Sequence, residues 1–180
     1  MRNIMNKHII AILLTTFTTS VFAADHMSIN GKTVTTSDTR STLIQKFGQP
    51  ESGTAQFSNW SIGNLSLYAN YSKQGLAQFS VNQLNTSPSK NFINIEGKTV
   101  YLGKDTIKTA TSKFKHACFN FDEGRQGSTY TMTPKTTVKN KLNIVLETTG
   151  DAYDVKTISN LPINGFSFTQ DAVAANHGCK

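Results

Sequence analysis

Two histidines in this chain each lie two positions before a cysteine, as His116-Ala117-Cys118 and His177-Gly178-Cys179. Two imidazoles and two thiolates can hold zinc tetrahedrally, and a thiolate beside a base can act as a nucleophile. The spacing is not that of a zinc finger, and residues i and i+2 do not face each other on a helix. Because the chain has only these two cysteines, the sequence favours a Cys118–Cys179 disulfide. We expect no metal, no cofactor and no catalytic residue here.

A second candidate for chemistry is the adjacent carboxylate pair Asp122-Glu123. Two carboxyl groups can serve glycoside hydrolysis when they lie on either side of a sugar bond. Here they precede Gly124-Arg125, which is more typical of a solvated loop tip. The Gly-x-Ser-x-Gly motif of a serine hydrolase is absent from the sequence. We therefore expect a binding protein and not an enzyme.

The first 23 residues have the pattern of a secretory signal peptide. Arg2 and Lys7 give a basic start, an apolar run begins at Ile9, and Val21-Phe22-Ala23 resembles a cleavage site. This predicts a mature chain from about Ala24 in the periplasm or outside the cell, where disulfides persist. No cysteine follows the predicted cut to carry a lipid, and no second apolar stretch predicts an integral membrane segment.

The net charge is +7 over 180 residues, and it falls to about +5 if the predicted signal peptide is removed. Between Lys90 and Lys141 the chain has ten lysines and arginines against four acids. Such a surface can attract an acidic protein or the phosphates of the cell envelope, so peripheral envelope contact is one interpretation; a merely solvated lysine-rich face is the other. Export and the lack of an arginine-rich motif argue against nucleic acid.

The sequence repeats itself. Gly31–Val34 recurs as Gly97–Val100 at an offset of 66 residues, and two later pairs recur at an offset of 67. Those pairs are Asp38-Thr39 with Asp105-Thr106, and Lys46-Phe47 with Lys113-Phe114. The pattern predicts an internal duplication. The expected organisation is a signal peptide over 1–23, a first repeat over 24–84, a linker over 85–94, a second repeat over 95–160, and a C-terminal tail over 161–180 tied by the disulfide.

Each expected repeat begins with a short amphipathic helix. Ser37 or Asp38 would cap the first helix and Asp105 the second. The apolar stripes are Leu43, Ile44 and Phe47, and then Ile107, Ala110, Thr111 and Phe114. A positive-φ residue is expected at Gly48, where the first helix ends.

Alternating segments after each helix predict three strands. They cover 55–62, 65–71 and 76–82 in the first repeat and 128–134, 142–148 and 152–159 in the second. The predicted fold class is α+β, with two tandem repeats, each a short helix packed on an antiparallel β-meander. The repeats would form either two small lobes side by side or one continuous sheet with both helices behind it.

The segment Ser37–Ser52, followed by three predicted strands, resembles the helix-and-hairpin modules of the SmpA/OmlA (BamE) outer-membrane lipoproteins. Their helix ends in a Leu-Gly-x-Pro-type turn, which reads Phe47-Gly48-Gln49-Pro50 in this sequence. Two such modules in one exported chain are similar to the β-lactamase inhibitor protein family. The resemblance implies a sheet that grips a protein partner and no catalytic activity.

The expected binding surface is the solvent-facing side of the sheet. Alternation places Tyr68 opposite the buried Leu65/Leu67 face, and aromatic side chains are good binding anchors. Trp60 shares a face with Ile62, so a core position is the competing interpretation, and a surface tyrosine can also do nothing specific. The candidate partner-binding residues are Tyr68, Trp60, Tyr101, Asn70, Ser66 and Lys156.

These observations favour a protein-binding module that sterically blocks an exported enzyme or toxin, as an inhibitor or an immunity protein. The alternative is a factor for envelope assembly, or one associated with the cell wall, that works through the basic second half.

Overall fold

The computed structural model describes residues 24–85, 87–135, 143–171 and 179. The predicted signal peptide, His177 and most of the C-terminal tail lie outside these residues. Two antiparallel sheets and three short helices make up the described part of the chain.

A small four-stranded sheet is built from two hairpins. Strands β1 (His26–Ile29) and β2 (Lys32–Val34) form one, and β7 (Phe92–Ile95) and β8 (Lys98–Tyr101) form the other. β1 pairs antiparallel with β7, which gives the order β2-β1-β7-β8.

The repeated Gly-Lys-Thr-Val motif forms the return of each hairpin. Asn30-Gly31 and Glu96-Gly97 have positive φ at both turn positions, at 49° and 74° and at 52° and 79°. Two positive φ angles define the type I′ turn, for which Asn-Gly is a strong sequence signal. The repeated motif was not predicted to form strands. Strand β7 begins within the expected 85–94 linker.

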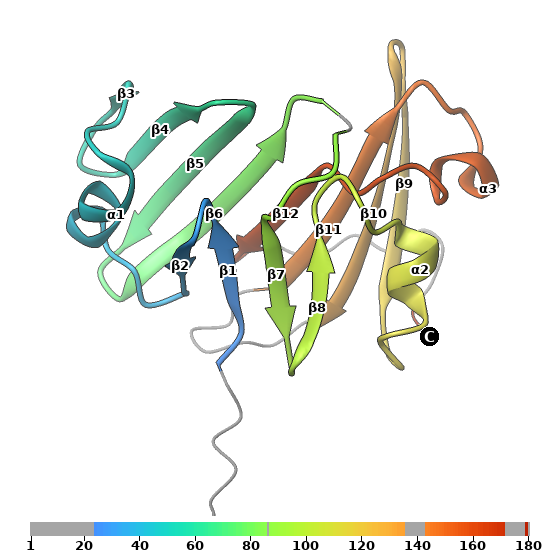
Figure 1. The fold of residues 1–180 in the computed structure, drawn as a ribbon, viewed down its shortest axis with the longest axis horizontal. Helices are drawn as coiled ribbons and strands as arrows, with labels where there is room; N and C mark the ends of the chain where they lie inside the picture. The colour runs from blue at the N-terminus through green and yellow to red at the C-terminus, as the bar shows by residue number, and fades with distance from the viewer. Residues whose placement is uncertain (1–23, 86, 136–142, 172–178, 180) are drawn as a thin grey trace, which may run out of the picture.

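The large sheet has eight strands in the order β3-β4-β5-β6-β12-β11-β10-β9 (Figure 1). Its strands are β3 (Ser52–Gly53), β4 (Phe57–Ile62), β5 (Leu65–Ser72), β6 (Gly75–Gln83), β9 (Cys118–Gly124), β10 (Gly127–Lys135), β11 (Asn143–Gly150) and β12 (Gly165–Thr169). The two halves of the sheet join where β6 pairs antiparallel with β12 and Phe79 lies opposite Phe168. One continuous sheet therefore spans both halves of the chain.

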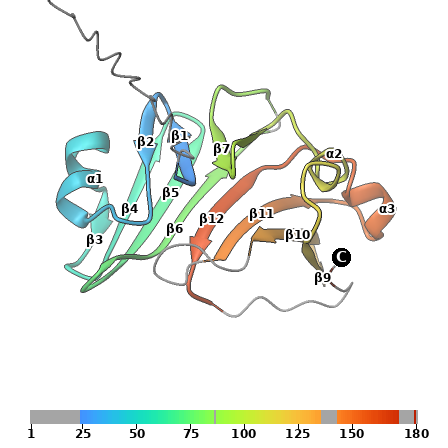
Figure 2. The same ribbon diagram turned by 90° about the horizontal axis from the view of Figure 1, so that it is seen from below.

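The helices and the small sheet cover one face of the large sheet (Figure 2). The buried side chains between these layers form a single core cluster. Phe79, Phe166 and Phe168 at the junction are at most 1% exposed, and Met27 and Ile93 join them from the small sheet. Burying a phenylalanine of this kind contributes about 2–3 kcal/mol to stability. Because these residues come from both sheets and both halves of the chain, one core holds them together.

Helices α1 (Arg40–Phe47) and α2 (Ile107–Thr111) lie on the covered face, as the apolar stripes predicted. Their N-caps are Thr39 and Thr106, each in a capping box with the threonine three residues later. The prediction of caps at Ser37, Asp38 or Asp105 was wrong by one or two positions. Gly48 does have the expected positive φ, at 86°.

Residues 152–159 do not form the predicted strand. Val155–Ile158 is a short helix, α3, whose N-cap Asp154 accepts a hydrogen bond from the Thr157 backbone N–H at 2.8 Å. The apolar residues Val155 and Ile158 have the i, i+3 spacing of a helix face. Strand β12 pairs with β11 in place of the predicted strand and lies beside β6, and β9, which was not predicted, forms the edge of the second half of the sheet.

The strand order in each sheet is mirrored about its centre. β1 meets β7 in the small sheet and β6 meets β12 in the large one. Each half of the chain contributes one hairpin, one helix under its sheet, and four strands of the large sheet, with α3 as an addition in the second half. The architecture is α+β and mostly antiparallel.

Candidate functional site

The face of the large sheet that points away from the helices, called the outer face below, is polar in its first half. On β5, Leu65, Leu67 and Ala69 are buried, whereas Ser66, Tyr68 and Asn70 alternate with them. Because successive side chains of a strand point to opposite faces, these three lie on the outer face. The structure therefore brings together three of the predicted partner-binding residues.

The neighbours of these residues are also uncharged. Tyr68 lies opposite Asn59 on β4 and Ser80 on β6. Asn70 lies opposite Phe57 and Gln78 in the same way. Side chains directly opposite each other on one sheet face are in contact range. Hydroxyl and amide groups thus surround Tyr68 on both sides.

Phe57 and Tyr68 form an aromatic pair on the outer face. Their ring centroids are 6.4 Å apart and their planes differ by 29°, which is a stacked arrangement. Both side chains are half-buried. Stacked rings lose little conformational freedom when a partner covers them, so they suit a binding anchor. Phe57 was not among the predicted binding residues, although the alternation of the strand places Ser58 and Trp60 on the core face and Phe57 on the opposite one.

The second half of the outer face has one carboxylate near its middle. Burial raises the pKa of the Glu147 carboxyl group, and a hydrogen bond with Thr149 partly counteracts this. Across the pair with β12, Glu147 lies opposite Gly165. A Cβ atom at position 165 would lie 2.7 Å from Asn82 Oδ1 and 3.2 Å from Glu147 Cβ, so a larger residue there would displace the Asn82 and Glu147 side chains.

Trp60 is not on this surface. Its side chain is 2% exposed, it packs at 6.1 Å from the Phe47 ring, and its indole N–H donates to the Gly48 carbonyl at 2.9 Å. A tryptophan whose one donor is satisfied inside the protein serves the core. Trp60 is therefore a core residue and not a surface candidate, and it links the end of α1 to β4.

Tyr101 and Lys156 lie away from the outer face. Tyr101 is on β8 of the small sheet, with its ring 5.6 Å from Phe92 and Lys104 Nζ 5.2 Å from its centroid. Lys156 is an exposed residue of α3, on the covered side of the large sheet. The six predicted residues thus divide among the outer face, the core and the helix side.

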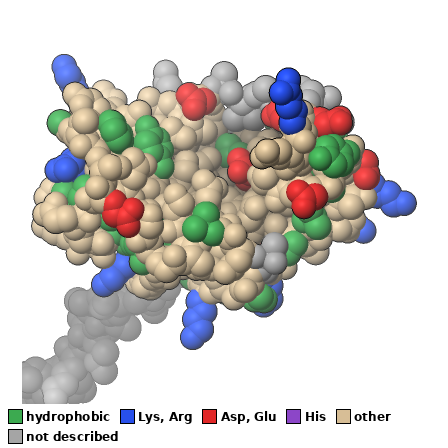
Figure 3. Space-filling view, turned by 90° about the horizontal axis from the view of Figure 1, so that it is seen from above, with side chains coloured by type: hydrophobic (Ala, Val, Ile, Leu, Met, Phe, Trp, Pro, Cys, Tyr) green, Lys and Arg blue, Asp and Glu red, His purple; other side chains and the backbone are tan. Residues whose placement is uncertain are grey.

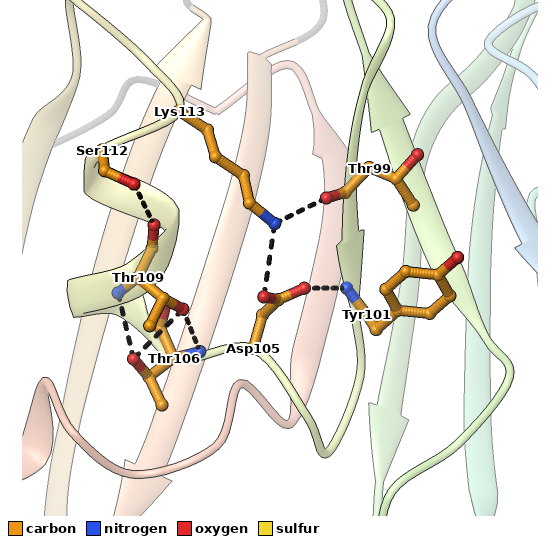
Figure 4. A network of polar contacts seen from close by, with 7 residues as sticks. All are labelled: Thr99, Tyr101, Asp105, Thr106, Thr109, Ser112 and Lys113. Carbon is orange, nitrogen blue, oxygen red and sulfur yellow. Dashed lines mark hydrogen bonds and ion pairs between the residues drawn. The ribbon is translucent and has the colours of Figure 1, made fainter.

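A polar network joins α2 to the small sheet (Figure 4). One oxygen of Asp105 accepts from the Tyr101 backbone N–H at 2.7 Å, and the other forms an ion pair with Lys113 at 3.2 Å. Lys113 also donates to the Thr99 carbonyl at 2.7 Å. In the first half, Asp38 accepts from the Thr35 N–H and from Lys46. These networks position the helices.

The cysteine and carboxylate candidates do not form a catalytic or metal site in the described structure. Cys118 and Cys179 form the predicted disulfide. Asp122 and Glu123 are consecutive exposed residues of β9, so their side chains point to opposite faces and do not form a carboxylate pair. Among the described residues, no cluster of three or more histidine, cysteine, aspartate or glutamate side chains suits a metal ion.

The described helices are too short or too polar for a membrane crossing.

Charges are unevenly spread over the surface. Acidic side chains gather at the right of the space-filling view, over the end of the molecule that carries β9, β10 and α3, and lysines and arginines project from the periphery (Figure 3). The basic composition of the second half therefore does not produce a uniformly basic surface.

Comparison of the chain with protein-family models, with curated proteins and with solved structures finds no match.

Proposed function

We propose that this chain is an exported protein-binding module, made of two copies of one hairpin, helix and sheet unit, that sterically blocks an exported enzyme or toxin. The supporting observation is the outer face, a continuous surface of hydroxyl and amide groups around the Phe57–Tyr68 pair. Depletion of charge with retention of aromatic anchors is typical of the central part of a protein interface. The duplication is supported by the mirrored strand orders and by the two capping boxes.

The size of the face supports the same proposal. Apart from the two-residue β3, the sheet has seven strands of five to nine residues. At a spacing of about 4.8 Å these strands present roughly 800 Å². This is the area that each partner buries in a standard protein complex. Binding by such a face needs no reacting group, so the proposed mechanism is coverage of the partner's active cleft.

The proposal is tested by capture with the exported chain from the periplasm and medium of its own cells. Ser66→Arg and Asn82→Arg place bulk and charge on the outer face at two exposed positions. Ser41→Arg, at an exposed position of α1, is the control. We expect the unmodified chain and the control to capture an exported enzyme and inhibit it at one-to-one stoichiometry, and the two outer-face variants to lose both properties. Equal capture by all variants would refute the proposal.

A second candidate function is that of an envelope assembly or cell-wall-associated factor. The exposed lysines on the helix side of the second half, Lys104, Lys108, Lys115 and Lys156, favour it because the envelope is rich in phosphates. Sedimentation with isolated peptidoglycan or with anionic vesicles would separate the two candidates. Only the envelope function predicts that the chain sediments with them at low salt and is released by added salt.

A further inference from the structure

We propose that the groove between α2 and α3 is a second binding site, which takes an acidic peptide segment by one apolar side chain. The groove has a volume of about 480 Å³ and lies on the covered side of the large sheet. It is separate from the outer face, so this inference does not depend on the proposed function.

Aromatic rings form the floor of the groove. Phe119 on β9 and Tyr130 on β10 are stacked, with centroids 6.0 Å apart and planes 19° apart, and both line the groove. Phe121 supports Tyr130 edge-on at 6.3 Å. The two floor residues are only 5% and 7% exposed. A floor held in this way is already ordered before a ligand arrives, which lowers the entropic cost of binding.

The groove exists because α2 covers its sheet less completely than α1 does. The 67-residue offset aligns Leu43 and Ile44 of α1 with Ala110 and Thr111 of α2. Leu43 is buried and Ile44 packs against the core, whereas Thr111 lines the groove. Helix α2 also has five residues against eight in α1. Smaller side chains on a shorter helix leave a small part of the two floor rings, which are 5% and 7% exposed, at the surface of the groove.

The second wall is α3, which is joined to α2. The Lys108 backbone N–H donates to the Ser159 carbonyl at 3.0 Å. This hydrogen bond holds the last residues of α3 against the first turn of α2. Val155 and Ser159 then complete the lining from the α3 side. The two walls therefore belong to one joined unit and not to two independent loops.

One lysine stands on each wall. Lys108 of α2 and Lys156 of α3 both line the groove and are exposed. The ion pairs among the described residues are made by Lys46 and Lys113 and not by these two. Asp154, the acid at the start of α3, accepts a hydrogen bond from Thr157, and it attracts Lys156 electrostatically without forming an ion pair with it. An apolar floor between two cations complements an apolar side chain with a carboxylate on each side.

The dimensions favour a short extended segment over a folded partner. The volume lies in the range of pockets that hold small ligands. An amphipathic helix would need a longer groove with several anchors. The occupant that fits is thus a peptide segment in which aspartate or glutamate flanks a phenylalanine or a similar residue.

The test uses the disulfide-bonded exported chain and the peptide Gly-Ser-Asp-Phe-Asp-Ser-Gly in a titration followed by NMR. We expect shifts at Thr111, Tyr130 and Ser159. Replacing both aspartates of the peptide by asparagine should weaken binding about tenfold, and so should replacing its phenylalanine by glycine. Equal affinity for the three peptides would overturn the proposal. So would displacement of the peptide by phosphatidylglycerol vesicles at low lipid concentration, because that would identify an anionic lipid as the occupant.

Two protein variants complete the test. Thr111→Ile restores the residue type that α1 has at the aligned position and should fill the groove and abolish the shifts. Lys156→Glu, on an exposed helix position, should weaken binding about tenfold even if Thr111→Ile does not fold. Lys73→Glu, an exposed lysine in the β5–β6 turn, is the matched control and should bind normally. Ser66→Arg should also bind the peptide normally, which separates this site from the outer face. Normal binding by Lys156→Glu would contradict the proposal.

Discussion

At the scale of single residues, the Asp38 carboxylate accepts hydrogen bonds from three donors. Its side chain is 6% exposed and accepts from the Thr35 N–H at 2.8 Å, the Thr42 hydroxyl at 2.7 Å and Lys46 at 2.5 Å. Asp105 makes two of the corresponding contacts and is 17% exposed. The more buried aspartate should therefore contribute more to stability.

Replacing Asp38 with alanine leaves a lysine and a backbone N–H without their acceptor. We expect a loss of about 3 kcal/mol in the free energy of unfolding, measured by urea denaturation. Asp105→Ala is the matched comparison and should lose about half as much, because Asp105 is more exposed. A smaller loss for Asp38→Ala than for Asp105→Ala would show that burial does not rank the two networks.

Glu147 gives a pH-dependent prediction at the same scale. Burial raises the pKa of this carboxyl group above its usual 4.5, with the Thr149 hydrogen bond opposing the shift. The native state thus prefers the protonated form, so this group favours folding below pH 4.5 and loses that contribution as the pH rises through the raised native pKa.

Glu147→Gln should therefore be more stable than the unmodified chain at pH 7 and equally stable at pH 3.5. Urea unfolding at both pH values measures the difference. Glu123→Gln, at an exposed position, should change stability at neither pH. A gain for Glu147→Gln that persists in acid would assign the effect to packing and not to charge.

At the scale of elements, the capping boxes explain why such short helices form. Helices of five and eight residues are far below the length that is stable alone in water. Thr39 and Thr106 each accept from the backbone N–H three residues later, at 3.3 and 3.1 Å. Tertiary packing on the sheet provides the remaining stability.

Thr39→Ala and Thr106→Ala should each lower the free energy of unfolding by about 1 kcal/mol. Thermal unfolding followed by circular dichroism measures the change. Ser41→Ala, at an exposed position within α1, tests the same chemical change without a cap and should have little effect. Equal effects at positions 39 and 41 would contradict the capping role.

At the scale of the whole molecule, the disulfide joins the edge strand β9 to the end of the chain. Its cysteines are 61 residues apart in the sequence. Closing a loop of this length stabilises a fold by about 4 kcal/mol in the chain-entropy model. The Cys118→Ser, Cys179→Ser double variant should lose up to that amount, as measured by guanidinium unfolding. Adding a reductant should produce the same loss in the unmodified chain and none in the double variant.

Much of the local structure was predictable because it depends on neighbouring residues. Alternation placed Leu65 and Leu67 inside and Tyr68 outside, and Gly48 ended the first helix as expected. The first small-sheet hairpin was also predictable from its Asn30-Gly31 pair, although it was not predicted; the second has Glu96-Gly97, which is a weaker signal. Helix α3 was mistaken for a strand because four residues are too few for periodicity to separate the two.

Long-range pairing was not predictable in the same way. The sequence determined helices α1 and α2, the strands β4, β5, β6, β10 and β11, the disulfide and the repeated motif, since each depends on local spacing or on there being only two cysteines. Only the tertiary structure decided that β6 meets β12 in one sheet, that Trp60 points inward, and that Lys108 and Lys156 face one groove. The physical reason is that side-chain exposure and strand partners depend on packing between residues far apart in the chain, which local propensity does not encode.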